Sequence, residues 1–186
     1  LGDIRGPTLV VVPAGGGNQS FAIGKYEIST GQWNDYCRTS GQCTASGADA
    51  GLPITNIPYT QVKQYIAWLS DKSGEHYFLP SFEQWKYAAS VGGTDANHDF
   101  NCQVTLGGQV IKGLSMVNTE TGRANAWGLT NYVGNAQEWV RSGAGVAAAG
   151  GDYQDPLSQC STSLLRPDNG SANAVTGFRV ARDNDK

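Results

Sequence analysis

The chain has 186 residues, of which 39% are hydrophobic and 16% charged, and its formal net charge is −3. This composition suits one domain with a sizeable core, and the absence of a basic stripe argues against nucleic acid as a partner. The longest apolar runs, "LVVVPA" and "GVAAAGG", are too short to cross a bilayer, so we expect no membrane segment in this chain. The chain begins at Leu1 without Met, which predicts a processed product or a piece excised from a longer protein.

The first two predicted elements are strands. "TLVVVPAGGG" predicts a buried strand that ends in a glycine turn, and "FAIGKYEIS" alternates apolar and polar residues as a second strand does. A short helix follows in "STGQWNDYCRTSG". Ser29 and Gln32 there match a capping box, and Gly41 marks the end.

Two further helices are predicted before the pattern changes. "TQVKQYIAWLSDKSG" is amphipathic and stops at Gly74, and its apolar face consists of Val62, Tyr65, Ile66 and Leu69. "SFEQWKYAAS" repeats the capping pattern with Ser81 and Gln84. We interpret all five tryptophans, on these helices and later in the chain, as mainly structural.

After residue 91 the periodicity dissolves into a long polar middle, and the tail gives only short strand signals in "EWVRS", "AAAGGDYQ" and "TGFRVAR". A loop region of this length is unusual inside a compact domain. Metal ions, disulfides or a functional loop are the usual reasons for one. We therefore expect one of them to hold the middle in place.

The four cysteines are even in number and fit two disulfides, Cys37–Cys43 within "CRTSGQC" and Cys102–Cys160. This pairing predicts an oxidising, extracytoplasmic compartment, periplasmic or at the cell surface. Four reduced, buried thiols are the alternative. No CxxC pair is present, so a zinc site is poorly supported.

Six stretches, taken together, resemble the formylglycine-generating enzyme family, the sulfatase-modifying branch of the C-type lectin-like fold. They occur in the family's order from Gly6 to Arg182: "GPTLVVVPAG", "GKYEISTGQWNDYC", "YFLPSFEQWKYAAS", "NAWGLTNYVGNAQEWV", "GGDYQ" and "GFRVAR". The resemblance implies a single domain over residues 1–186. Its fold would be an irregular α+β fold with few short strands, two or three short helices and a meandering middle.

Active members of this family resemble copper-dependent oxidases, whose chemistry uses two thiolates close together because Cu(I) prefers soft ligands. Laid on the family's motif, the first thiol position falls on Asp155 and the second on Cys160. We therefore expect the oxidase activity to be absent, with a repurposed site at Asp155 and Cys160 as the alternative. His76 and His98, the only histidines, match no metal or catalytic motif.

The same resemblance implies one structural Ca²⁺ site in "NYVGNAQEWV". Carried over by position, its ligands are Asn131, the carbonyls of Gly134 and Ala136, and Glu138. Calcium prefers hard oxygen ligands from side chains and backbone alike. A β-turn capped by Asn131, with Glu138 in a salt bridge, is the alternative.

The segment from Gly143 to Thr176 lies where active relatives bind substrate peptide, so it is our candidate ligand surface. Its mixture of aromatic, amide and small residues suits adaptable recognition. The candidate contacts are Tyr153, Gln154, Asp155, Ser158, Gln159, Arg166, Asp168 and Asn169. An ordinary solvated loop is the alternative.

These observations predict a non-catalytic ligand- or protein-binding domain whose partner is a protein, peptide or small molecule. One setting that resembles known family members is the extracytoplasmic sensor domain of a bacterial Ser/Thr kinase. Another is a displayed variable binding protein of a diversity-generating retroelement. A copper-dependent oxidase or a divergent relative is the enzymatic alternative.

Overall fold

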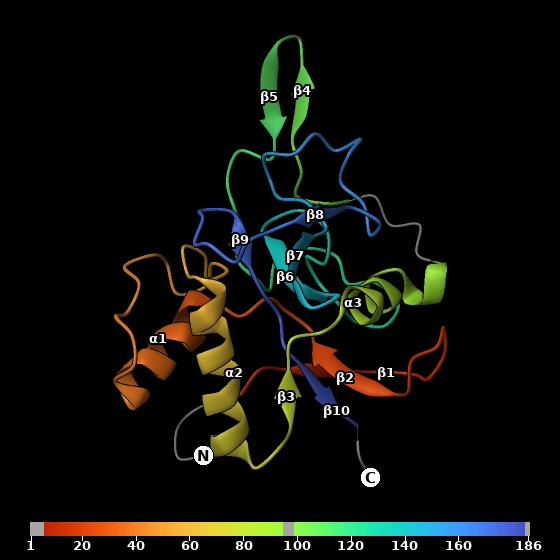
Figure 1. The fold of residues 1–186 in the computed structure, drawn as a ribbon. Helices are drawn as coiled ribbons and strands as arrows, with labels where there is room; N and C mark the ends of the chain where they lie inside the picture. Colours follow the sequence, from red (N-terminus) through yellow and green to blue (C-terminus); the bar gives the residue numbers. More distant parts are fainter. Residues whose placement is uncertain (1–5, 95–98, 185–186) are drawn as a thin grey trace.

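The fold consists of two small sheets, three helices and a projecting hairpin, in a computed structural model that describes residues 6–94 and 99–184 (Figure 1). The helices are α1 (Thr30–Ser40), α2 (Tyr59–Ser73) and α3 (Phe82–Ala89), and a 3-10 turn spans Val91–Gly93. The strands are β1 (Leu9–Val12), β2 (Phe21–Gly24), β3 (Tyr77–Phe78), β4 (Val104–Leu106), β5 (Gln109–Lys112), β6 (Gln137–Ser142), β7 (Gly145–Ala149), β8 (Leu165–Pro167), β9 (Thr176–Gly177) and β10 (Ala181–Asp183). The expected irregular α+β class is confirmed.

The first sheet joins the two ends of the described chain. Its strand order is β1-β2-β10-β3, so β10 lies between β2 and β3, with Ala181 opposite Ile23 on one side and Phe78 on the other. β1 is therefore an edge strand. The prediction of a buried first strand is wrong in this respect, because Val12 is buried but Val11 is 58% exposed.

The helices begin and end where the capping signals predict. Ser29 accepts a hydrogen bond from the backbone N–H of Gln32 and Gln32 accepts one from that of Ser29, which completes the capping box of α1. Ser81 and Gln84 do the same for α3. Gly41 and Gly74 adopt left-handed conformations after α1 and α2, where glycine costs least.

Aromatic side chains fill the space between α1, α2 and the first sheet. Trp33 stacks on Tyr65 at 5.7 Å between ring centroids and meets Phe178 edge-on. Trp85 belongs to a second cluster, which packs α3 against the second sheet. Trp33, Trp68, Trp85 and Trp139 are all buried, and Trp127 is half-buried against Tyr87, so the structural role expected for the tryptophans is confirmed.

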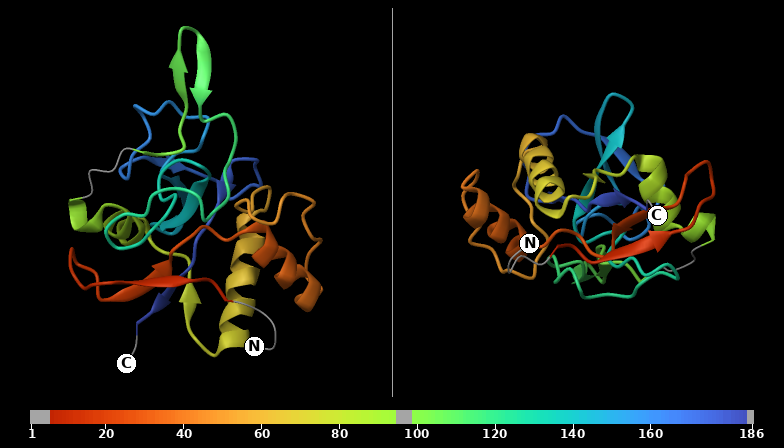
Figure 2. Two further views of the ribbon diagram at one scale, coloured as in Figure 1. Left: turned by 180° about the vertical axis from the view of Figure 1, so that it is seen from behind. Right: turned by 90° about the horizontal axis from the view of Figure 1, so that it is seen from below.

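The second sheet has the order β8-β7-β6-β9. It carries the predicted calcium turn, residues 131–138, and the loop between β7 and β8, residues 150–164, which we call the tail loop. β6 pairs antiparallel with β7 and parallel with β9, so Glu138 lies opposite Ala149 on one side and Gly177 on the other. Viewed from behind and from below, this sheet lies between α3 and the helix pair α1–α2 (Figure 2).

The polar middle contains a hairpin that periodicity did not predict. β4 and β5 form a sheet of their own, joined by Gly107 and Gly108, which both have positive φ. This turn needs positive φ at two successive positions, which favours Gly-Gly. The hairpin stands out from the body of the molecule (Figures 1 and 2).

Both expected disulfides, Cys37–Cys43 and Cys102–Cys160, are present. The second joins the base of the hairpin to the tail loop, and it is the constraint that the long middle required. Two disulfides are typical of proteins in oxidising compartments. None of the helices in residues 6–94 and 99–184 is both long and apolar enough to cross a membrane.

Candidate functional site

The two positions that resemblance assigns to a copper pair carry no free thiolate. Cys160 is bonded to Cys102, and Cys102 is completely buried. Asp155, at the first position, is held by Arg166 through two hydrogen bonds, from Nη1 to Oδ2 at 2.8 Å and from Nη2 to Oδ1 at 2.6 Å. A disulfide and an ion-paired carboxylate are poor ligands for Cu(I), so this donor set does not fit the metal.

Asp155 also closes the turn that follows β7. Its Oδ2 accepts the backbone N–H of Asp152 at 2.8 Å, and its own N–H donates to the carbonyl of Asp152. Burial acts to raise the pKa of Asp155, but the hydrogen bonds from Arg166 and Asp152 outweigh it and leave the pKa below its usual value. The carboxylate is therefore ionised at neutral pH and serves to order the loop.

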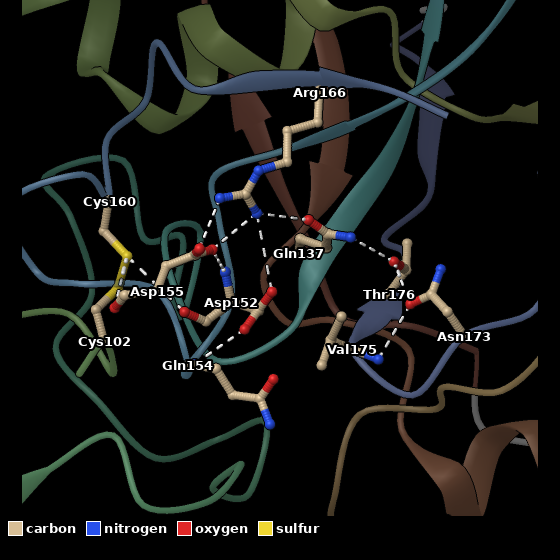
Figure 3. A network of polar contacts seen from close by, with 10 residues as sticks. All are labelled: Cys102, Gln137, Asp152, Gln154, Asp155, Cys160, Arg166, Asn173, Val175 and Thr176. Carbon is tan, nitrogen blue, oxygen red and sulfur yellow. Dashed lines mark hydrogen bonds and ion pairs between the residues drawn. A yellow bond between two sulfur atoms is a disulfide. The ribbon is translucent and has the colours of Figure 1, made fainter. Parts of the chain in front are cut away.

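The polar network continues from Arg166 across the second sheet (Figure 3). Arg166 donates to Oε1 of Gln137 at 3.1 Å, and Nε2 of Gln137 donates to the hydroxyl of Thr176 at 2.7 Å. That hydroxyl donates in turn to Oδ1 of Asn173 at 2.7 Å. The chain of contacts fixes β8, β6 and β9 relative to one another, beneath the tail loop.

A cavity of about 600 Å³ opens beside the disulfide, between the base of the hairpin and the tail loop. Its volume lies in the range of small-molecule sites, and no charged residue of the described part of the chain lines it. The lining consists of Phe100, Gln103, Val104, Thr105, Pro156, Leu157, Ser158 and Cys160. Backbone hydrogen bonds join the two sides of the cavity: the N–H of Gln103 donates to the carbonyl of Asp155, and the N–H of Leu157 donates to that of Gln103.

The predicted contact residues do not gather in one place. Only Ser158 lines this cavity, and Asp155 and Arg166 engage each other at the side of the loop. Asp168 and Asn169 line a separate hollow with Pro167 and accept hydrogen bonds from the backbone of the next turn. Tyr153, Gln154 and Gln159 lie on the loop, and Gln154 donates to the Tyr153 hydroxyl at 3.0 Å.

Sequence reasoning missed the cavity residues contributed by the hairpin. The usable signal was "LGGQ": two glycines between apolar residues indicate a tight hairpin turn. Together with the Cys102–Cys160 pairing, that turn would have placed residues 103–105 beside residues 156–160.

The predicted calcium turn is built around a buried ion pair. Glu138 is 1% exposed and accepts hydrogen bonds from Arg179, Nε to Oε2 at 2.7 Å and Nη2 to Oε1 at 2.6 Å. It also accepts one from Nε1 of Trp85 at 2.8 Å. A divalent cation at this carboxylate would have to share it with the guanidinium, so Arg179 weakens Glu138 as a calcium ligand, and binding through Glu138 stays a prediction. Binding through Asn131 and the carbonyls of Gly134 and Ala136 stays a prediction.

Arg179 completes the turn by using its remaining donors on backbone carbonyls. Nη1 donates to the carbonyls of Gly24 and Lys25, and Nη2 donates to that of Thr130. The guanidinium thus ties the first sheet to the turn. Its positive charge balances the buried carboxylate of Glu138 in the turn.

Glu27 is a second buried carboxyl next to this pair, and it was not predicted. Asn135 donates to its Oε1 at 2.9 Å, and its Oε2 has no hydrogen-bond partner among residues 6–94 and 99–184. Burial and the nearby charge of Glu138 raise the pKa of Glu27 to about 8, so the group is neutral at pH 7. The outward-facing His76 contacts Asp183, and His98 lies outside the described residues.

These features define a lectin-like α+β domain whose polar networks stabilise loops. A family model described as "Sulfatase-modifying factor enzyme 1-like domain" matches residues 16–184, and the chain belongs to this family. A comparison with curated protein sequences found no match.

Solved structures with the same fold share little sequence with this chain. PvdO from Pseudomonas aeruginosa has a TM-score of 0.75 at 19% identity, covering 96% of this chain and 91% of that one. CarF has a TM-score of 0.70 at 19% identity, covering 99% and 96%. Treponema denticola variable protein 1 has a TM-score of 0.68 at 16% identity, covering 96% and 92%. At these identities the likeness establishes the fold alone.

Proposed function

We propose that this protein is a non-catalytic ligand- or protein-binding domain on a sulfatase-modifying-factor scaffold. The observation that carries the proposal is the state of the two catalytic positions: Asp155 is ion-paired with Arg166, and Cys160 is bonded to Cys102. Neither position therefore offers a thiolate that could bind Cu(I). What remains is a rigid loop surface beside a cavity.

The cavity determines the class of ligand. Its walls offer apolar side chains with a few hydroxyl and amide groups, and none of the described side chains that line it is charged. An uncharged ligand with an aromatic or aliphatic group is therefore the best fit, because a charged group would lose its hydration without gaining a partner. The ligand can be a small molecule or an uncharged side chain of a protein.

We also propose a cellular location and a kind of parent protein for this domain. Two disulfides favour a periplasmic or cell-surface location. A sensor domain of a bacterial Ser/Thr kinase is the first candidate. A displayed variable binding protein is the second, which is supported by the likeness to a protein named variable protein 1. A structural calcium ion at the turn would be compatible with either setting.

A fragment screen tests the binding role. Uncharged aromatic fragments are screened by ligand-observed NMR against the protein and against Ser158→Trp, which places an indole in the cavity. Thr39→Trp, beside a different surface hollow, serves as the control. Binding that Ser158→Trp abolishes and Thr39→Trp preserves supports the proposal, whereas binding unaffected by Ser158→Trp contradicts it.

The enzymatic alternative is tested separately. A cysteine-containing peptide is incubated with the protein and copper under air, and its mass is measured. We expect no conversion of the cysteine, before or after mild reduction of the protein. Turnover would establish a divergent oxidase and overturn the proposal.

A further inference from the structure

Asn169 and Gly170 form the only Asn-Gly pair in the chain. The pair lies in the loop that joins β8 to β9, and Asn169 is exposed there. The side-chain amide of an asparagine in such a pair is open to attack by the backbone nitrogen of the glycine, because glycine has no Cβ to obstruct the approach. The contacts around this pair supply the other groups that the attack requires.

The Asn169 side chain turns towards the backbone that follows it. Its Oδ1 accepts the backbone N–H of Ser171 at 2.9 Å. In this arrangement an asparagine side chain folds over the peptide of the next residue, which here contains the Gly170 nitrogen. The Ser171 N–H also polarises the side-chain carbonyl, and it is in place to stabilise the negative charge that Oδ1 acquires during attack.

The Gly170 nitrogen has a proton acceptor within reach. Its N–H donates to Oδ1 of Asp168 at 2.7 Å, a distance at which a carboxylate can act as a general base. The carbonyl of Gly170 accepts the backbone N–H of Tyr59 at 2.9 Å, which anchors this residue to the start of α2. Nucleophile, base, electrophile and oxyanion donor therefore lie on four consecutive residues.

We propose that Asn169 is a self-modification site, at which the Gly170 nitrogen displaces the side-chain amide with Asp168 as the general base. The nitrogen bonds to Cγ of Asn169 while its proton passes to Asp168. The Cγ–Nδ2 bond then breaks, and the leaving group takes up that proton and departs as ammonia. One water molecule opens the resulting cyclic imide, which gives either aspartate or isoaspartate, whose main chain runs through Cβ.

The modification changes both the charge and the backbone of this loop. A carboxylate replaces a neutral amide beside Asp168, so the formal net charge of −3 becomes one unit more negative. Isoaspartate also lengthens the main chain by one carbon and displaces Gly170 from Tyr59. Because Pro58 provides no side-chain cap for α2, the helix then loses an acceptor for one of its first N–H groups.

The proposal is independent of the proposed ligand-binding role, because Asp168, Asn169, Gly170 and Ser171 do not line the cavity beside the disulfide. Failure of fragment binding would leave it unaffected. Failure of the modification would likewise leave the binding role unaffected.

Mass spectrometry of proteolytic peptides tests the proposal after the folded protein has been kept at physiological pH and temperature for several weeks. We expect Asn169 to convert, with release of ammonia and formation of isoaspartate. Asn118 is the internal control and should remain an amide. It is also exposed and its Oδ1 accepts the N–H of Glu120 at 2.9 Å, but the N–H of Thr119 donates to the carbonyl of Gly51 and not to a carboxylate.

Asp168→Asn isolates the general base, since its amide oxygen still accepts the N–H of Gly170 but is a poor proton acceptor. We expect Asn169 to convert roughly tenfold or more slowly in the folded variant, because a positioned general base typically contributes at least that factor. In urea, where the loop contacts are absent, the two proteins should convert at similar rates. An unmodified Asn169 in the parent protein, equal rates in the two folded proteins, or the same slowing in urea overturns the proposal.

Discussion

Arg179 and Glu138 form an ion pair that solvent does not reach, with 0% and 1% of their side chains exposed. The pair joins the end of the chain to the turn at residues 131–138, and Trp85 of α3 contributes a third hydrogen bond. Buried charges are tolerated only when they are paired and fully hydrogen-bonded. Almost every donor and acceptor of this pair has a partner, so the turn depends on both residues.

Replacing Glu138 by Gln should destabilise the protein strongly. The guanidinium of Arg179 would remain buried without a counter-ion, which typically costs roughly 3–5 kcal/mol. Urea unfolding followed by tryptophan fluorescence measures the loss. Glu75→Gln is the matched control, because Glu75 pairs with Arg182 at 3.5 Å on the surface and is 53% exposed, and we expect a loss under about 1 kcal/mol. Equal losses for the two variants would show that the buried pair has no special role.

The parts of this fold that follow local rules could be predicted from the sequence. Ser29 with Gln32 and Gly41 define a helix because caps and stops act within a few residues. The turn "NYVGNAQEWV" could be located for the same reason. The partner of Glu138 could not, because Arg179 is 41 residues further along the chain and only tertiary packing brings the two together.

In the candidate ligand surface, too, contacts between residues far apart in the sequence could not be predicted. Asp155 could be recognised as a substitution at a catalytic position, but its bidentate contact with Arg166 could not. The hairpin was missed because β4 and β5 are short, mostly exposed and lack a buried face, so they leave no period-two pattern to detect.

Stability should fall as the pH rises towards 8 because of Glu27. Burial and the charge of Glu138 raise its pKa from 4.5 to about 8, so the folded state keeps a proton that the unfolded state releases above pH 4.5. The stabilisation is therefore complete below pH 4.5 and lost progressively up to about pH 8. For this fully buried group the shift corresponds to roughly 3–5 kcal/mol.

Glu27→Gln isolates this effect, since an amide keeps an oxygen that can accept from Asn135 but cannot ionise. The variant should equal the parent protein near pH 4.5 and exceed it in free energy of unfolding at pH 8. Urea unfolding at a series of pH values measures the difference. Parallel pH profiles for the two proteins would show that Glu27 does not retain the proton.

The two disulfides should contribute unequally to stability. In a chain-entropy estimate, the bridge over a separation of 58 residues contributes about 4 kcal/mol and the bridge over 6 residues about 2 kcal/mol. Cys102→Ala/Cys160→Ala should therefore lower the melting temperature more than Cys37→Ala/Cys43→Ala. The first variant should also loosen the cavity, so its loss of fragment binding would exceed that of the second. The reverse order of melting temperatures would mean that strain or residual unfolded structure dominates.

We expect calcium to bind the turn weakly. With Glu138 committed to Arg179, the predicted ligands that remain are the Asn131 side chain and two carbonyls, and calcium affinity rises with the number of charged ligands. We expect millimolar calcium to be needed before the melting temperature rises. Asn131→Gly should abolish the effect and keep the positive φ of 51° at this position without strain. Asn131→Asp should strengthen binding by adding a carboxylate. Micromolar affinity in the parent protein would contradict this expectation, because it would require Glu138 to leave Arg179 and bind the ion.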